Sequence, residues 1–147
     1  MDIFQVDDDG RLFISPAITE WASVDRHGID VVTDLDGGLD ECIPVIPNRC
    51  VYVYMPIDDD DRELPNMTRL RAIARMAAAL MAEGHRVLSH CGMGFNRSAL
   101  MAGLILIELG MSGSEAVARL RTRRAGALYN DLFATSLESL GPEGMKV

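Results

Sequence analysis

Residues 87–98 read VLSHCGMGFNRS, and this stretch decides how the rest of the sequence is interpreted. Residues 86–90 are mostly apolar and predict a short buried strand that ends at His90. Residues 98–109 are apolar on almost every side, which predicts a helix buried over most of its surface and ended by Gly110. Cys91 therefore lies in a tight loop that joins a buried strand directly to a buried helix.

This predicted geometry favours the binding of an anion. The N–H groups of a loop that meets a helix N-terminus point at one spot, together with the positive end of the helix dipole. Gly92 and Gly94 allow the backbone to fold closely around a ligand, and Arg97 can donate two charge-assisted hydrogen bonds to phosphate oxygens. The same groups would stabilise the thiolate of Cys91 and make it a nucleophile. A lone buried cysteine is usually a plain core residue, but this surrounding pattern favours catalysis.

The rest of the sequence predicts an α/β domain. Further strands are expected at residues 3–6, 11–15, 29–35 and 50–55. Helices are expected at residues 19–27, 66–83 and 130–140, and Ser112 with Glu115 forms a capping box that starts one more. This order predicts one layered domain with a central, mostly parallel sheet flanked by helices, with its core at about residues 10–140. The tail after Gly141 is expected to be loose.

The composition fits one soluble domain and excludes some partners. The 147 residues are 48% apolar, which is enough for a core without cross-links. The formal charge of −8 would repel polyanions, so neither nucleic acid nor an anionic membrane is an expected partner. The first residues lack the pattern of a signal peptide, so the cytoplasm is the expected compartment. Redox pairing of Cys91 with Cys42 or Cys50 stays open, as does the oligomeric state.

The pattern His90-Cys91, five residues, then Arg97-Ser98 resembles the motif of the protein tyrosine phosphatase superfamily, and the chain is similar to its dual-specificity family. The resemblance implies that family's fold and a phosphatase that uses no metal and no cofactor. It implies that Cys91 is the nucleophile, that Arg97 binds phosphate, and that the Ser98 hydroxyl donates to the cysteine sulfur. His90 would hold the loop by hydrogen bonds. The implied phosphate-binding loop comprises Gly92, Met93, Gly94, Phe95, Asn96 and Arg97.

The family also uses a general acid on a separate loop, and four consecutive aspartates are candidates. They follow the predicted strand at residues 50–55 and a Pro56-Ile57 dipeptide. The family pattern Pro-Ile-x-Asp selects Asp59 for this role. Asp58 and Asp60 stay open as alternatives, because an acidic run is also the usual composition of a solvated loop.

Two residues near the C-terminal helix resemble further family features. Asn130 corresponds to an asparagine that braces the active-site loops in family members, and it also fits a helix N-cap. The two roles are compatible. Arg124 is a candidate for binding a second anionic group of a substrate, although an exposed arginine usually binds no ligand.

The sequence therefore predicts a dual-specificity protein phosphatase that acts on phosphorylated proteins or peptides through a phosphocysteine. A phosphatase of the same superfamily with a non-protein substrate, such as a phosphoinositide or an RNA 5'-triphosphate, stays an alternative, as does a catalytically silent phosphate-binding module. A magnesium-dependent phosphatase with an aspartate nucleophile is disfavoured. Its Asp-x-Asp-Gly-Thr motif would fall at Asp34, but Gly38 replaces the threonine.

Overall fold

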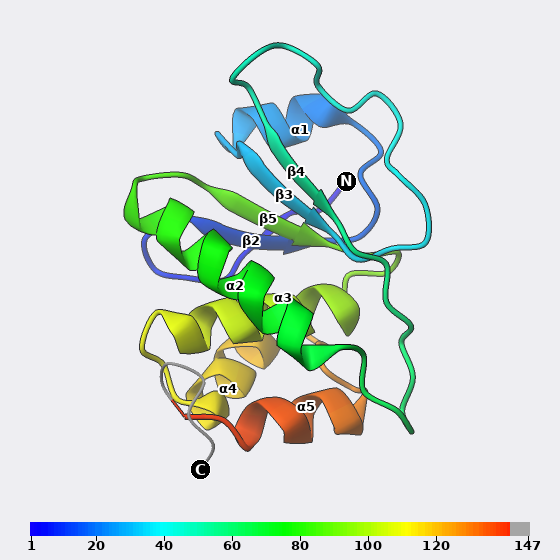
Figure 1. Ribbon diagram of the computed structural model, residues 1–147, viewed down its shortest axis with the longest axis vertical. Helices are drawn as coiled ribbons and strands as arrows, with labels where there is room; N and C mark the ends of the chain where they lie inside the picture. Colours follow the sequence, from blue (N-terminus) through cyan, green and yellow to red (C-terminus); the bar gives the residue numbers. More distant parts are fainter. Residues whose placement is uncertain (142–147) are drawn as a thin grey trace.

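A five-stranded sheet forms the centre of the computed structural model, which describes residues 1–141 (Figure 1). The strands lie in the order β1-β2-β5-β3-β4. Only β1 runs antiparallel to its neighbour, while β2, β5, β3 and β4 are parallel. Their bounds are β1 Phe4–Gln5, β2 Leu12–Ser15, β3 Val31–Asp34, β4 Val51–Tyr54 and β5 Val87–His90. The predicted mostly parallel sheet is confirmed.

Five helices within residues 1–141 cover the two faces of this sheet unequally. The helix α1 lies on one face, and the other four lie on the opposite face (Figure 1). Their bounds are α1 Trp21–Arg26, α2 Met67–Ala82, α3 Arg97–Glu108, α4 Gly113–Arg123 and α5 Asp131–Glu138. The bounds of the predicted strands and helices agree with these to within two residues. The prediction of an α/β layered fold is confirmed.

Two apolar clusters, one on each face, explain why the strands are apolar throughout. The larger cluster lies between the sheet and helices α2 to α5. It contains the side chains of alternate strand residues such as Leu12, Val31 and Val87. The smaller cluster lies on the face of α1 and takes the residues between them, such as Val32 and Leu88. Both faces of the parallel strands are therefore buried, which produces continuous apolar runs instead of alternation.

The helix α3 lies at the centre of the helical layer. Every residue from Ser98 to Ile107 is buried. The helix α5 approaches it closely, because a methyl group in place of the Gly103 hydrogen would lie only 2.7 Å from a methyl carbon of Leu137. The N-terminus of α3, which follows Cys91, is therefore held by packing along the whole helix.

The parallel strands bring the candidate site residues to one edge. Because β2, β3, β4 and β5 run in the same direction, their carboxyl ends lie together. In open α/β sheets this edge is the usual place for ligand binding. The segments that follow β3, β4 and β5 therefore meet there.

Two sequence predictions concern the ends and surroundings of the chain. The loose tail predicted after Gly141 lies outside the described residues. Within residues 1–141, every helix is too short or too polar to traverse a lipid bilayer. The cytoplasmic compartment stays a prediction.

Candidate active site

The loop of residues 91–97, called the cysteine loop below, turns from β5 into α3. Gly94 makes this turn possible, because its φ of +76° belongs to the left-handed region that favours glycine. A Cβ atom at Gly94 would also lie 2.8 Å from the backbone nitrogen of Pro16. No other residue meets both demands. Cys91 is thereby placed at the floor of the loop, where it is only 2% exposed.

Backbone N–H groups converge on the Cys91 sulfur. The Sγ atom accepts hydrogen bonds from the N–H of Gly94 at 3.3 Å and from the N–H of Ser98 at 3.4 Å. Among residues 1–141, no acceptor pairs with the remaining N–H groups of the cysteine loop, which belong to Gly92, Met93, Phe95, Asn96 and Arg97. Donors that stay unpaired at a helix N-terminus form an anion-binding site. The predicted loop geometry is therefore present.

The Ser98 side chain differs from the prediction. Its hydroxyl is buried and has no hydrogen-bond partner among residues 1–141. The backbone N–H of Ser98, in the first turn of α3, contacts the sulfur instead. The predicted hydrogen bond from the hydroxyl to the sulfur is thus wrong for this conformation.

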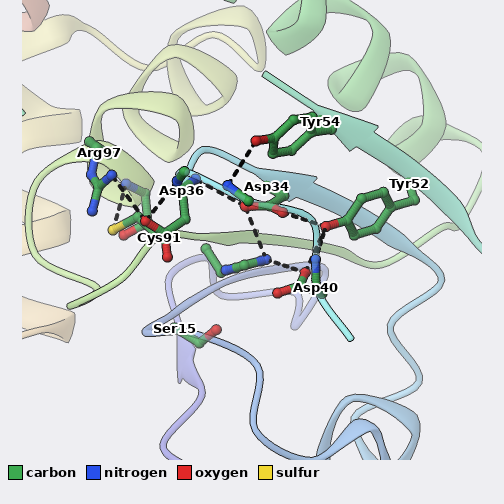
Figure 2. A network of polar contacts seen from close by, with 12 residues as sticks. Ser15, Asp34, Asp36, Asp40, Tyr52, Tyr54, Cys91 and Arg97 are labelled. Carbon is green, nitrogen blue, oxygen red and sulfur yellow. Dashed lines mark hydrogen bonds and ion pairs between the residues drawn. The ribbon is translucent and has the colours of Figure 1, made fainter. Parts of the chain in front are cut away.

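Arg97 lies beside the cysteine at the edge of a cleft. One nitrogen, Nη1, donates to a carboxylate oxygen of Asp36 at 3.2 Å and to the carbonyl of Ile57 at 3.5 Å. Figure 2 shows Asp36 next to Arg97 and Cys91. The cleft is lined by residues from three loops, among them Gly37, Pro56, Asp58, Asn66 and Arg97. Asp58 is therefore the aspartate of the acidic run that shares this cleft with the arginine.

Asp59 contacts the cysteine loop and the start of α5. Its carboxylate accepts hydrogen bonds from the amide of Asn96 at 2.8 Å and from the amide of Asn130 at 2.8 Å. Asn96 also accepts from the backbone N–H of Asn130 at 2.9 Å. The three residues join the acidic loop, the cysteine loop and the start of α5 in one network.

Asn130 combines both roles that were expected of it. Its side-chain oxygen accepts from the N–H of Phe133 at 3.1 Å, so the N-cap prediction is confirmed. Its amide nitrogen donates to Asp59 and also to the carbonyl of Asp60 at 3.0 Å. One side chain therefore starts α5 and holds the acidic loop.

Arg124 supports the outside of the cysteine loop. Its guanidinium carbon lies 4.0 Å from the ring centre of Phe95 and 4.5 Å from that of Phe4. It also donates to the carbonyls of Gly94 at 3.5 Å and Met93 at 3.4 Å. The guanidinium is thus already occupied by two rings and two carbonyls. The second anion site at Arg124 stays a prediction that these contacts do not favour.

A largely buried polar cluster contains His90, which precedes the cysteine, and three residues that Figure 2 shows close together, Asp34, Asp40 and Tyr52. His90 contacts Asp40 through Nε2 at 2.7 Å, which ties β5 to the loop of residues 35–50. The Tyr52 hydroxyl donates to Asp34 and lies 2.9 Å from an oxygen of Asp40. His90 therefore holds a neighbouring loop by hydrogen bonding.

Burial governs the charges in this cluster. It raises the pKa of the Asp34 carboxyl above its ordinary value, although the hydrogen bond from Tyr52 acts in the opposite direction. Burial and the contact with Asp34 together raise the pKa of the Tyr52 hydroxyl far above its ordinary value. Tyr52 consequently stays protonated and serves as a donor to the carboxylates.

The same cluster contains a set of donors that could hold a metal ion. One ligand atom each from Asp34, Asp40 and His90 lies within 4.8 Å of the others. These atoms already hydrogen-bond to each other and to Tyr52, so hydrogen bonding accounts for their arrangement. Asp34 is also fully buried, unlike the accessible aspartate nucleophile that a magnesium-dependent phosphatase requires.

Sequence reasoning missed Asp36, Asp40 and Tyr52. From the sequence, residues 34–38 are considered only as an imperfect match to the Asp-x-Asp-Gly-Thr motif. A signal for polar residues near the cysteine loop was nonetheless present, because Asp34 ends a strand that lies beside β5 in a parallel sheet. Polar residues that follow such a strand share an edge with the cysteine loop.

Comparison with known proteins identifies solved structures that share this fold. No protein-family model matches the sequence, and no curated protein matches it. Human DUSP28 is 21% identical, with a TM-score of 0.77 over 92% of this chain and 90% of that one. A mouse putative dual specificity phosphatase complexed with zinc tungstate is 24% identical, with a TM-score of 0.76 over 92% and 84%. Tk-PTP in its active form is 28% identical, with a TM-score of 0.70 over 92% and 95%.

The chain therefore has the fold of the protein tyrosine phosphatase superfamily. Its architecture matches that of the dual-specificity phosphatases among these structures. The resemblance that the cysteine motif indicated is confirmed at the level of the fold.

The buried cluster generates a test of stability. Tyr52→Phe should lower the free energy of unfolding by about 1–3 kcal/mol at pH 8, because the buried Asp34 carboxylate loses one of its two donors and keeps only the backbone N–H of Asp36. The hydroxyl stabilises the charged carboxylate, so its loss raises the pKa of Asp34 further. The loss in free energy of unfolding is therefore complete above the pKa of Asp34 in the variant. It becomes smaller as the pH falls through that pKa. Urea unfolding at pH 8 and at a series of lower pH values, down to the limit at which the protein stays folded, measures both effects.

Tyr54→Phe is the matched control. The Tyr54 hydroxyl accepts from the N–H of Gly38 at 2.8 Å at the protein surface, where water can replace it. This variant should lose less than about 1 kcal/mol. Equal losses in the two variants, or a Tyr52→Phe deficit that does not change with pH, would contradict the role given to the cluster.

Proposed function

We propose that the protein is a cysteine-dependent phosphomonoester hydrolase. The observation that carries this proposal is the convergence of backbone N–H groups on the buried Cys91 sulfur, with Arg97 beside it at the start of α3. A tetrahedral dianion fits such a ring of donors. The same donors favour the thiolate, which is the reactive form of cysteine.

In the proposed first step, the Cys91 thiolate attacks the phosphorus atom in line with the leaving group. The S–P bond forms while the bond from phosphorus to the leaving oxygen breaks, and a protonated Asp59 gives that oxygen its proton. Charge spreads over the equatorial oxygens in the loose transition state. The loop N–H groups and Arg97 would stabilise that charge.

In the proposed second step, water hydrolyses the phosphocysteine. Asp59, now ionised, takes a proton from the water as it attacks phosphorus, and the S–P bond breaks to return the thiolate. Asp59 is supported by its position against Asn96 of the cysteine loop. Asp58 is the rival for the proton-transfer role, because it shares the cleft with Arg97. No metal or cofactor enters these steps.

The substrate that we propose is a phosphorylated protein or peptide, on tyrosine as well as serine or threonine. The cysteine loop has no lysine for additional phosphates, and Arg124 is engaged by carbonyls and rings. Asp58 lines the cleft, and Asp58, Asp60 and Glu63 line a pocket next to it. These features disfavour phosphoinositides and RNA 5'-triphosphates, which carry several phosphates. The formal charge of −8 supports the further proposal that neither nucleic acid nor an anionic membrane is a partner, and we propose the cytoplasm as the compartment.

The first test concerns activity itself. The protein should hydrolyse p-nitrophenyl phosphate in the presence of EDTA and be inhibited by vanadate. Cys91→Ser should lose essentially all turnover and still bind phosphate, because only the nucleophile is removed. A magnesium-dependent enzyme would stop in EDTA, and a silent binding module would not turn over at all, so either result contradicts the proposal.

The second test assigns the proton-transfer residue. Asp59→Asn should slow hydrolysis of esters with poor leaving groups by about 10²- to 10⁴-fold, the usual contribution of general acid catalysis. Esters with good leaving groups should be affected much less. Asp58→Asn is the matched comparison, since it removes the neighbouring carboxylate. If the large loss follows Asp58→Asn instead, the role belongs to Asp58.

The third test concerns the substrate. In a panel of phosphopeptides, phosphoinositides and nucleotides at equal concentration, phosphopeptides should give the highest kcat/KM, because each added phosphate meets more negative charge around the cleft. The preference should weaken at high salt, which screens exposed charges. Cleavage of multiply phosphorylated lipids alone would rule out a protein phosphatase.

A further inference from the structure

The strand β4 forms an open edge of the sheet (Figure 1). Among residues 1–141, β3 is the only strand that pairs with it. The backbone N–H groups of Val51 and Met55 donate to carbonyls on the β3 side, at 2.9 Å and 3.0 Å. Because N–H groups alternate in direction along a strand, those of Tyr52 and Tyr54 point away from β3. They are therefore available to pair with another extended chain.

The side chains along this edge are apolar and exposed. Natural edge strands are usually protected from pairing by charged side chains, proline or bulges, but β4 contains no charged residue and no proline. The exposed fraction is 42% for Val51 and 39% for Tyr54, and it is 91% for Val45 and 62% for Ile46 in the turn that leads into β4. An exposed apolar strand edge of this kind marks a site of interaction.

The edge leads directly into the candidate active site. Residues 55–58 follow β4 and line the cleft, which Arg97 also lines. The carbonyl of Ile57, three positions after Tyr54, lies 3.5 Å from Nη1 of Arg97. Since an extended chain advances about 3.3 Å per residue, a peptide paired with β4 needs only about three further residues to reach the phosphate site. The edge of β4 and the cleft are therefore continuous.

We propose that the edge of β4 docks the substrate. An extended apolar segment of the phosphorylated protein pairs with β4 and adds a strand to the sheet, while its phosphorylated residue enters the cleft. This inference rests on the proposed phosphatase function and names the kind of segment that the site accepts. Main-chain hydrogen bonds provide affinity in such strand addition, and alternate side chains provide specificity. The continuity with the cleft favours a substrate over a second copy of this chain, which needs no access to the cleft.

The first experiment compares kcat/KM for matched phosphotyrosine peptides. The extended peptide carries a segment of alternating valine and threonine about three residues from the phosphotyrosine. It is made with the segment before or after that residue, because a strand can pair in either direction. The control peptide carries glycine and serine instead, which keeps the charge and lowers the strand propensity. One of the two extended peptides should have a kcat/KM roughly five- to fifty-fold higher than its control, mainly through KM, as expected for two or three added hydrogen bonds with apolar contacts.

N-methylated peptides test the backbone pairing without any change in the protein. Methylation of every second residue in the segment removes one of the two sets of N–H groups. Methylation of the set that faces β4 should abolish the advantage of the extended peptide. Methylation of the other set should retain most of it, because those groups point to solvent.

Two protein variants test the same contact from the side of β4. Val51→Lys and Val45→Lys place a charge on the apolar edge and should remove most of the advantage of the extended peptide. Val45→Lys changes an almost fully exposed side chain, so it keeps the test valid if Val51→Lys does not fold. Leu109→Lys is the matched control, because Leu109 is 47% exposed at the end of α3. All three variants should hydrolyse p-nitrophenyl phosphate as the wild type does, since none of these residues lines the cleft.

Several outcomes would overturn the proposal. Equal kcat/KM values for extended and control peptides, with normal turnover of both, would remove the docking edge and leave the phosphatase function intact. Equal effects of the two methylation patterns would exclude strand pairing. A dimer in sedimentation velocity that Val51→Lys dissociates would assign the edge to a second copy of this chain. If fluorescence anisotropy shows binding with the expected methylation pattern but no phosphopeptide is hydrolysed, the docking edge is supported and the proposed function is wrong.

Discussion

The site depends on the short turn from β5 into α3. Only six residues separate His90 from Arg97, and within them the backbone must bring the sulfur of one residue under the N-terminus of the helix. Gly94 provides the required left-handed conformation and fits against the backbone of Pro16. Because α3 is buried along most of its length, the packing of the whole helical layer holds this turn in place.

The balance of charge around the turn bears on the anion binding that we propose for this acidic protein. Asp36, Asp40 and Asp59 all lie within hydrogen-bond distance of the cysteine loop or of His90. Arg97 is the cation among the loop residues themselves. Backbone N–H groups must therefore provide much of the attraction, since they are dipoles without a net charge that carboxylates could cancel. The phosphate site that we propose therefore has few groups to offer a second phosphate.

The sequence predicted the elements of the fold because their signals are local. The helix of residues 66–83 has a regular apolar stripe, and the helix after Ser112 begins with a capping box whose side chain accepts from Glu115 as expected. Asn130 was found because its capping position and its place in the family pattern coincide. The proposed general acid is harder to identify from the sequence than Asn130. Four adjacent aspartates have the same local chemistry and differ only in the residues that they contact.

The partners of the acidic residues could not be predicted, because they are distant in the sequence. Asp40 meets His90, and Asp36 meets Arg97, only after β3 and β5 have paired. Burying Asp34 and His90 costs free energy that an apolar pair would not cost. Since the strands are already secured by apolar contacts on both faces, the cluster is not needed to hold the sheet together. Its effect is to fix the loop after β3 against the cysteine loop. The free energy that it costs to bury Asp34 and His90 therefore serves the geometry of the site.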